Sequence, residues 1–222
     1  ESGDEGRAVM LRACEAGDVQ GFLGALQASL RESGFMGARQ QVLRAAAADC
    51  GGGFWHFTLQ CLMASATKQT AQAAALLADV GPRSAAAPGG ERADIRPCLG
   101  ASGEAAVRQL ARSSLGLKLA QKVLQSWGVA EAECLQAETR QALAAAVLRE
   151  ARGGAPAAAA AALEALPSLL ELGAQREVLD KVDDGNRDDV ALKLAASLSR
   201  ECQSHFVERR QAQKRLKAAA RG

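Results

Sequence analysis

The sequence predicts an all-helical protein, built as an irregular α-solenoid of stacked helical hairpins. Aromatic residues make up only 3% of the 222 residues and tyrosine is absent, although hydrophobic residues, many of them alanine, reach 48%. β-Sheets favour aromatic and β-branched side chains, whereas alanine, leucine, glutamine, glutamate and arginine are strong helix formers. Apolar residues also recur at helical spacing, in segments that short breaks separate. A compact helical bundle is the alternative arrangement of the same helices.

Glycine and polar breaks divide the first 80 residues into short helices. Gly17 ends the first helix, Asp18 can cap the second, and Gly34 stops the second. Three glycines then precede a helix that is rich in aromatic and sulfur-containing residues. The expected helices are approximately 5–16, 19–33, 37–49, 54–67 and 69–80.

Residues 81–103 interrupt the helical pattern. They contain three of the five prolines and five glycines, so they cannot form one continuous helix. We expect a long loop here. It separates an N-terminal helical subdomain, residues 1–80, from a C-terminal helical repeat subdomain, residues 104–222.

The second half of the chain resumes the alternation of helices and short connections. Pro156 suits the first turn of a helix, and the alanine run that follows it has a high helix propensity. The stretch "VDDGNRDD" predicts a turn followed by a helix that an aspartate caps. The expected helices are 104–113, 116–127, 130–151, 157–164, 168–181, 188–201 and 203–220.

A four-residue string occurs twice in the second half. Leu117-Lys118-Leu119-Ala120 returns as "LKLA" at residues 192–195. The offset of 75 residues is about twice the length of common helical-hairpin repeats, although no tetratricopeptide or ankyrin consensus is present. The echo predicts that residues 117–127 and 192–202 occupy equivalent positions in two stacked hairpins.

The cysteines and the N-terminus bear on the cellular compartment. The six cysteines lie mostly in apolar helical patterns of a chain too large to need disulfides, which predicts reduced thiols in an intracellular protein, cytoplasmic or nuclear. The longest uncharged run, residues 50–67, is too polar and glycine-rich for a membrane span. The chain opens without methionine, so we expect its native N-terminus to be missing, and an organellar location stays open.

Catalytic and metal-binding signatures are weak. The only two imidazoles are His56, inside an apolar helix, and His205, which has no evident nucleophile nearby in sequence. The aspartates at 180–188 resemble a calcium loop, but an EF-hand would need ligands where Val182 and Ala191 stand. We therefore expect no cofactor and no metal. A polar cluster in a deep pocket around His56 would instead indicate an enzyme.

The C-terminal stretch "HFVERRQAQKRLKAAARG" gives the strongest functional lead. From Arg200 onward there are seven basic and two acidic residues, a local charge of +5. Such cations can bind phosphates electrostatically without reading sequence, whereas Phe206 is the only aromatic residue available for base stacking. A solvated helix that leads into a linker or another domain is the alternative. The candidate nucleic-acid-binding residues are Arg209, Arg210, Lys214, Arg215 and Lys217, with Arg221 beyond them.

Residues 115–202 contain "LKLAQKVLQSWGVAEAEC", then "LPSLLELGAQREVLDKV", then "DVALKLAASLSREC". This order resembles the helical region that precedes the exonuclease domain in Mut-7-like 3′–5′ exonucleases. The resemblance implies a non-catalytic helical module, with the enzyme following Gly222. The family's catalytic α/β domain carries an Asp-x-Glu strand that nothing here matches, so no catalytic residue is carried over.

Two functions follow as expectations. The first is a non-catalytic α-helical repeat module that acts as a protein-interaction scaffold. The second is an accessory domain of an exonuclease-type protein that helps to bind nucleic acid through its basic C-terminal helix. Neither makes this segment an enzyme on its own, and neither identifies a protein partner or an oligomeric state.

Overall fold

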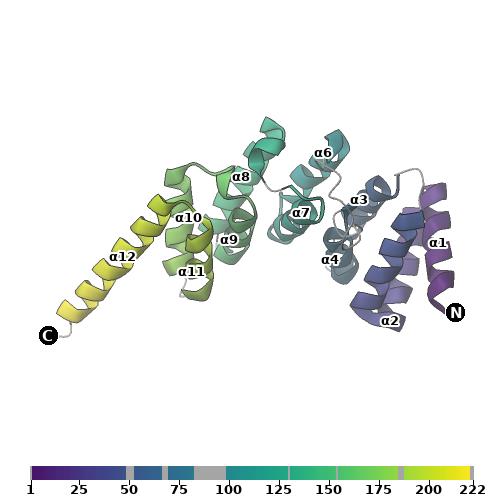
Figure 1. The fold of residues 1–222 in the computed structure, drawn as a ribbon, viewed down its shortest axis with the longest axis horizontal. Coiled ribbons are helices and arrows are strands. Elements are labelled where there is room, and N and C mark those ends of the chain that lie inside the picture. The colour runs from purple at the N-terminus through teal and green to yellow at the C-terminus, as the bar shows by residue number, and fades with distance from the viewer. Residues whose placement is uncertain are drawn as a thin grey trace, which may run out of the picture. The chain divides into compact units, whose positions relative to one another are not determined.

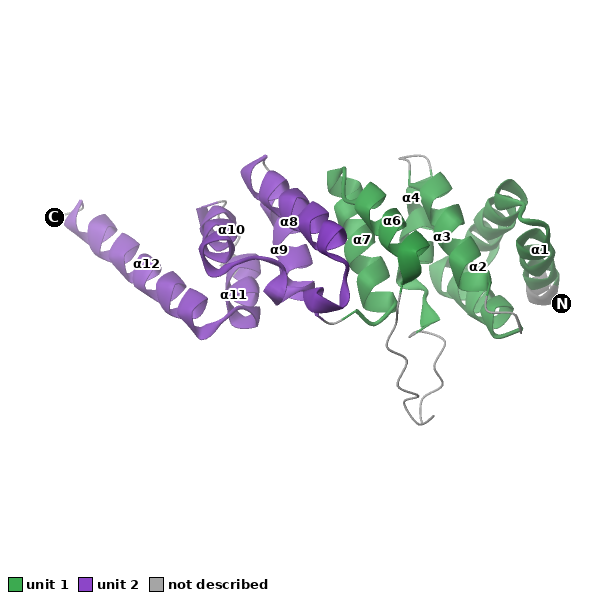
Figure 2. Ribbon diagram, turned by 90° about the horizontal axis from the view of Figure 1, so that it is seen from above, with its two compact units in different colours: residues 1–130 green, residues 131–222 purple. Residues whose placement is uncertain are grey.

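The structure is a computed structural model that describes residues 2–48, 53–66, 70–82, 99–129, 131–153, 155–184 and 188–220. Helices make up most of these ranges, and no strand occurs in them, which confirms the all-helical class (Figure 1). The chain forms two compact units, residues 1–130 and 131–222, which we call unit 1 and unit 2 (Figure 2).

Unit 1 is a succession of helices that pack mainly on their neighbours in the chain. α1 packs on α2, α2 on α3, and α3 on α4. α6 and α7 then pack on each other, and they also contact α3 and α4 respectively. The described helices of this unit are α1 (Ser2–Ala16), α2 (Val19–Ala48), α3 (Phe54–Ser65), α4 (Ala71–Asp79), α6 (Gly100–Leu110) and α7 (Ser114–Ser126).

Two glycines mark the helix boundaries that the sequence predicts in this unit. Gly17 has a φ of 67° and ends α1, and the Asp18 side chain then accepts a hydrogen bond from the Gly21 N–H at 2.9 Å. Gly34 also has a φ of 67°, with a ψ of −174°, inside α2. This backbone conformation is available essentially to glycine alone. α2 is therefore two helical segments that meet at Gly34, as the sequence predicts.

An aromatic cluster fills the core where α2 meets α3. The ring of Phe22 lies 5.4 Å from that of Phe57 and 6.0 Å from that of Phe54, both in edge-to-face orientation. All three side chains are buried, and Phe22 is fully so. Large apolar side chains from α1, α3 and α4 complete this core, among them Met10 and Leu62.

The boundary between the units differs from the predicted one. We expected a division at residues 81–103, but the compact units divide at residue 130. The reason is that α6 and α7 pack on α3 and α4, and the Ser126 hydroxyl donates a hydrogen bond to the Ala78 carbonyl at 3.0 Å. α6 already begins at Gly100, inside the predicted loop. The central part of that loop, residues 83–98, lies outside the described residues.

Unit 2 is arranged around α9, which contacts α8, α10 and α11. Pro156 occupies the first turn of α9, as predicted. α12 packs on α10 and α11. The described elements are η2 (Ala132–Cys134), α8 (Ala137–Arg152), α9 (Pro156–Ala165), η3 (Pro167–Leu169), α10 (Leu172–Asp184), α11 (Asp188–Ser197) and α12 (Arg200–Ala219).

Several predicted helices of this unit have different limits, among them 168–181, where α10 begins only at Leu172, and 203–220, where α12 already begins at Arg200. The helix expected over 130–151 is replaced by η2 and α8, because Leu135 and Gln136 adopt extended backbone conformations between them. The helix expected over 188–201 ends at Ser197. Ser199 then caps α12, its side chain accepting a hydrogen bond from the Cys202 N–H at 3.3 Å.

The structure also contradicts the predicted equivalence of residues 117–127 and 192–202. The first segment lies in α7 and its C-cap, whereas the second crosses the break between α11 and α12. Leu117 is fully buried, while Leu192 is 53% exposed. The repeated string therefore does not mark a repeat register.

Candidate functional site

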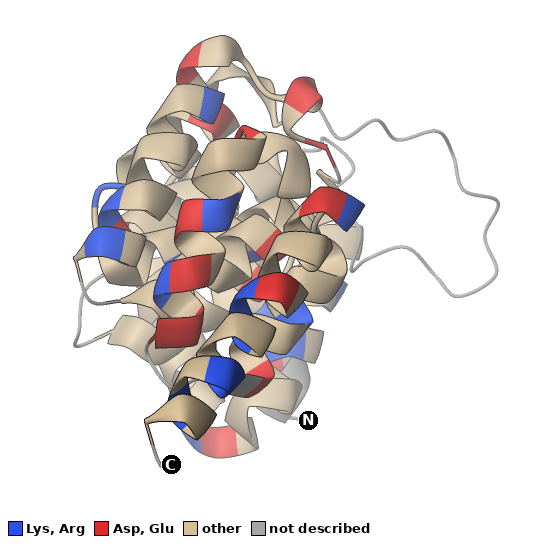
Figure 3. Cartoon of the chain, turned by 90° about the vertical axis from the view of Figure 1, so that its left-hand side faces the viewer, with Lys and Arg blue, Asp and Glu red and all other residues tan. Residues whose placement is uncertain are grey.

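α12 carries all five of the predicted nucleic-acid-binding residues, and the structure divides them into two groups. The first part of the helix packs on unit 2, with Cys202 and Phe206 buried. Basic residues continue along the helix toward the C-terminal end of the chain (Figure 3). Arg221 lies outside the described residues.

Arg209 and Arg210 bind carboxylates of α10 (Leu172–Asp184) rather than facing solvent. Asp183 accepts hydrogen bonds from Arg209 Nη1 at 3.2 Å and from Arg210 Nε and Nη2 at 3.0 and 2.6 Å. Arg209 also pairs with Asp180 and, at 2.5 Å, with Asp184. The Asp183 side chain is only 5% exposed, so these contacts satisfy a carboxylate that is nearly cut off from water.

His205 belongs to the same contact between α12 and α10. Its Nε2 lies 3.1 Å from one oxygen of Asp180, which also pairs with Arg209. The guanidinium of Arg210 lies over the ring of Phe206, 4.6 Å from its centroid. The aspartates lie about 25 residues before their partners in the sequence. The sequence predicts a turn and a helix cap for this acidic stretch, but Asp180, Asp183 and Asp184 instead hold α12 on α10.

Lys214, Arg215 and Lys217 form the second group. All three are exposed, and no acidic side chain in the described part of the chain pairs with them. From Gln211 to Ala220 every side chain except that of Gln213 is exposed, including Leu216 at 71%. We call residues 211–220 the distal segment of α12. It is a cationic helix end that also presents a large apolar side chain to solvent.

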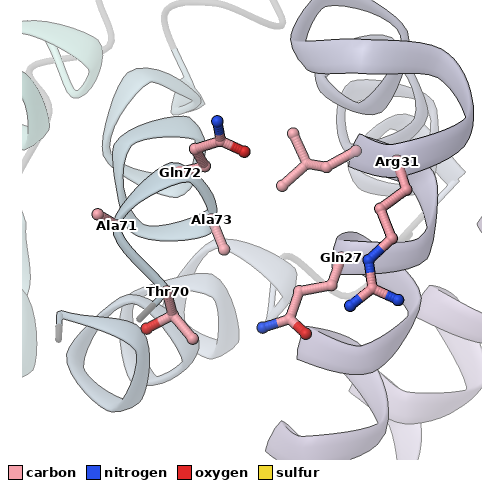
Figure 4. A pocket seen from close by; sticks show the side chains of 7 residues that line it. Gln27, Arg31, Thr70, Ala71, Gln72 and Ala73 are labelled. Atoms are coloured by element: carbon pink, nitrogen blue, oxygen red, sulfur yellow. The ribbon is translucent and has the colours of Figure 1, made fainter. Parts of the chain in front are cut away.

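A groove of about 500 Å³ lies on unit 1, between α2 and the start of α4. Gln27, Leu30 and Arg31 form one wall, and residues 70–73 form the other (Figure 4). Among the described lining residues, Arg31 is the only ionisable one. These residues can offer amide groups and one positive charge to a ligand, but no acid–base pair.

The two histidines have different surroundings. His56 borders a hollow of about 270 Å³ between α3 and α6, whose described lining residues include Leu59 and Met63 and no acidic side chain. The His56 ring also lies 6.1 Å from that of Trp127. Within the described ranges, therefore, no carboxylate of this lining orients the imidazole as it would in a catalytic base.

The described cysteines are free thiols that differ in their exposure to solvent. Cys61 is buried, and burial, followed by the nearby Cys14 and Asp18, raises the pKa of its thiol to about 12. Its nucleophilic thiolate form is therefore scarce at neutral pH. Cys202 is also buried, whereas Cys134 is exposed. Cys50 and Cys98 lie outside the described residues.

Neither a metal-binding cluster nor a membrane span is found in the described part of the chain. Within the ranges that the structure describes, no group of three or more His, Cys, Asp or Glu residues is placed to hold a metal ion. None of the described helices has the length and hydropathy needed to cross a membrane.

The chain matches no protein-family model, no curated protein and no solved structure. The similarity of residues 115–202 to the helical region of Mut-7-like exonucleases therefore stays a prediction.

Proposed function

We propose that this chain is a non-catalytic helical-repeat module that binds another protein. One observation carries the proposal: the distal segment of α12 is helical, yet its side chains contact almost nothing in the described part of unit 2. Isolated helices of this length are marginal in water, and helices in proteins gain most of their stability from packing. A partner that packs on the distal segment would supply that stabilisation.

The packing within each unit supports the proposed solenoid. Most helices contact their neighbours in the chain, as in α1–α2–α3–α4 of unit 1 and α9–α10–α11–α12 of unit 2. Stacked helical hairpins of an irregular α-solenoid have this property. Leu216 is an exposed apolar side chain on α12 that a packing partner would cover.

Site-specific photo-cross-linking tests the proposal. A photo-reactive amino acid would replace Gln72, in the unit 1 groove, or Leu216, on the distal segment, in cells that make the protein. We expect at least one position to form a covalent adduct with another protein. Adducts with nucleic acid alone, or none from either position, would refute a protein-binding role.

A second candidate function has its own supporting observation. Lys214, Arg215 and Lys217 are exposed cations without an acidic partner in the described ranges, as nucleic-acid binding by an accessory domain would require. Three phosphate contacts would give a slope of about −2 to −3 in log K against log salt. Fluorescence anisotropy with single- and double-stranded oligonucleotides measures this slope. No binding at low salt would eliminate this candidate.

A further inference from the structure

We propose that the distal segment of α12 binds an acidic amphipathic helix of the partner protein, along the same helix face that packs on α10. This inference rests on the proposed protein-binding function and names the chemistry of the partner.

One face of α12 continues from the packed part of the helix into the distal segment. Residues spaced alternately four and three positions apart lie on a single face of a helix. On this face of α12, burial decreases steadily toward the C-terminus: the first two residues are buried, the next two are half-buried and the last two are exposed. These residues are Cys202, Phe206, Arg209, Gln213, Leu216 and Ala220. Leu216 therefore lies on the packing face, beyond the point where unit 2 covers it.

This face of α12 already has a partner inside the chain. α10 presents Asp180, Asp183 and Asp184 to Arg209 and Arg210, so an acidic helix packs against the first part of α12. The contact combines an apolar anchor with paired charges.

The distal segment repeats the elements of this contact. Lys217 follows Arg210 by seven residues and Leu216 follows Arg209 by seven, so each lies on nearly the same side of the helix as its counterpart. Between Gln211 and Ala220 there are three cations and no acidic residue. An incoming helix with carboxylates beside an apolar stripe would contact Leu216 and Lys217 much as α10 contacts the preceding turns.

These observations favour a protein helix over nucleic acid. Lys214 and Arg215 are adjacent in a helix, so they project about 100° apart, and the three cations do not form a single row. The segment has no aromatic residue on which a base could stack, whereas its exposed leucine suits an apolar partner.

The test uses the full chain and a synthetic probe peptide. The probe is a fluorescent helical peptide with leucine at the a and d positions of each heptad and glutamate at the flanking positions. A matched peptide carries glutamine in place of each glutamate. We expect the glutamate peptide to bind at low salt and the glutamine peptide to bind much more weakly.

Variants of the chain locate the contact. Leu216→Ser should weaken binding of the glutamate peptide about tenfold, because an anchor that would be buried is lost. Val207→Ser is the matched control, since Val207 is also exposed, at 52%, but lies on the opposite side of the helix. Lys217→Gln should weaken binding more than Arg215→Gln does. Circular dichroism would verify that each variant keeps its helix content.

Several outcomes would overturn the inference. These are equal effects at Leu216 and Val207, equal binding of both peptides, or no binding of the glutamate peptide. Oligonucleotide binding that depends equally on all three cations and not on Leu216 would point to phosphate recognition instead. Self-association that Leu216→Ser abolishes would point to a second copy. A protein cross-link from position 72 alone would keep the proposed function while removing this inference.

Discussion

Asp183→Asn should detach the first part of α12 from α10 and destabilise unit 2. The carboxylate accepts three hydrogen bonds from Arg209 and Arg210, and its side chain is 5% exposed. Hydrogen bonds to charged groups contribute about 1.5–3 kcal/mol each. The two arginine side chains are 22% and 26% exposed, so their guanidinium groups regain some hydration, and the asparagine carbonyl still accepts one bond. The expected loss is about 2 kcal/mol in the free energy of unfolding.

Urea denaturation followed by circular dichroism would measure this loss, and calorimetry should show the unit 2 transition lowered by roughly 10 °C. Asp184→Asn is the matched control, because Asp184 is 56% exposed and, among the described residues, pairs with Arg209 alone. That control should cost less than about 0.5 kcal/mol. Equal losses in the two variants would refute the claim that the Asp183 contacts hold α12 in place.

The Asp183→Asn variant also distinguishes the two candidate functions of α12. Asp183→Asn removes one negative charge and weakens the hold of α10 on Arg209 and Arg210, although Asp180 and Asp184 still pair with Arg209. If α12 binds phosphates, the variant should bind oligonucleotides more tightly than the unaltered chain and with a steeper salt dependence. If the helix instead binds an acidic helix through Leu216, oligonucleotide affinity should stay low in both.

Three further predictions concern the core and the thiols. Phe22→Ala should destabilise unit 1 by about 3–5 kcal/mol in urea denaturation, because it leaves a cavity in a fully buried aromatic cluster; a loss below about 1 kcal/mol would contradict the cluster's role. Gly116→Ala should cost about 3 kcal/mol or more, since its new Cβ would overlap the Leu110 carbonyl oxygen; an unchanged melting temperature would show that the backbone yields easily. In the native protein at pH 8, iodoacetamide should label Cys134 quickly and Cys61 very slowly. The reason is that burial raises the pKa of the Cys61 thiol to about 12, so this thiol is almost fully protonated at pH 8. Peptide mapping by mass spectrometry would detect the order, and similar rates would contradict it.

Local signals in the sequence are sufficient to predict most of the helices. Gly17 and Asp18 mark the end of α1 and the start of α2, and Pro156 marks the start of α9. These residues act through backbone conformation and capping, which depend on a few adjacent positions. The break at Leu135 and Gln136 carries no glycine or proline, so a continuous helix was expected there.

Contacts between distant residues could not be predicted in the same way. The basic character of α12 is evident in the sequence, but the use of Arg209 and Arg210 in ion pairs depends on how α10 and α12 pack. Likewise, the sequence does not show that α6 and α7 belong to unit 1, because their contacts with α3 and α4 cross the segment that was expected to separate two subdomains.

α9 shows a different consequence of the alanine-rich composition. Its residues Ala158, Ala159, Ala160 and Ala162 are all buried, and the helix lies against three neighbours. Truncation at these positions can remove only one methyl group, so among apolar substitutions the larger losses come from enlargement. A single added methyl group at Ala159 or Ala160, which are fully buried, would push neighbouring helices apart. We therefore expect side-chain volume to limit natural variation along α9 even where the replacing residue is apolar.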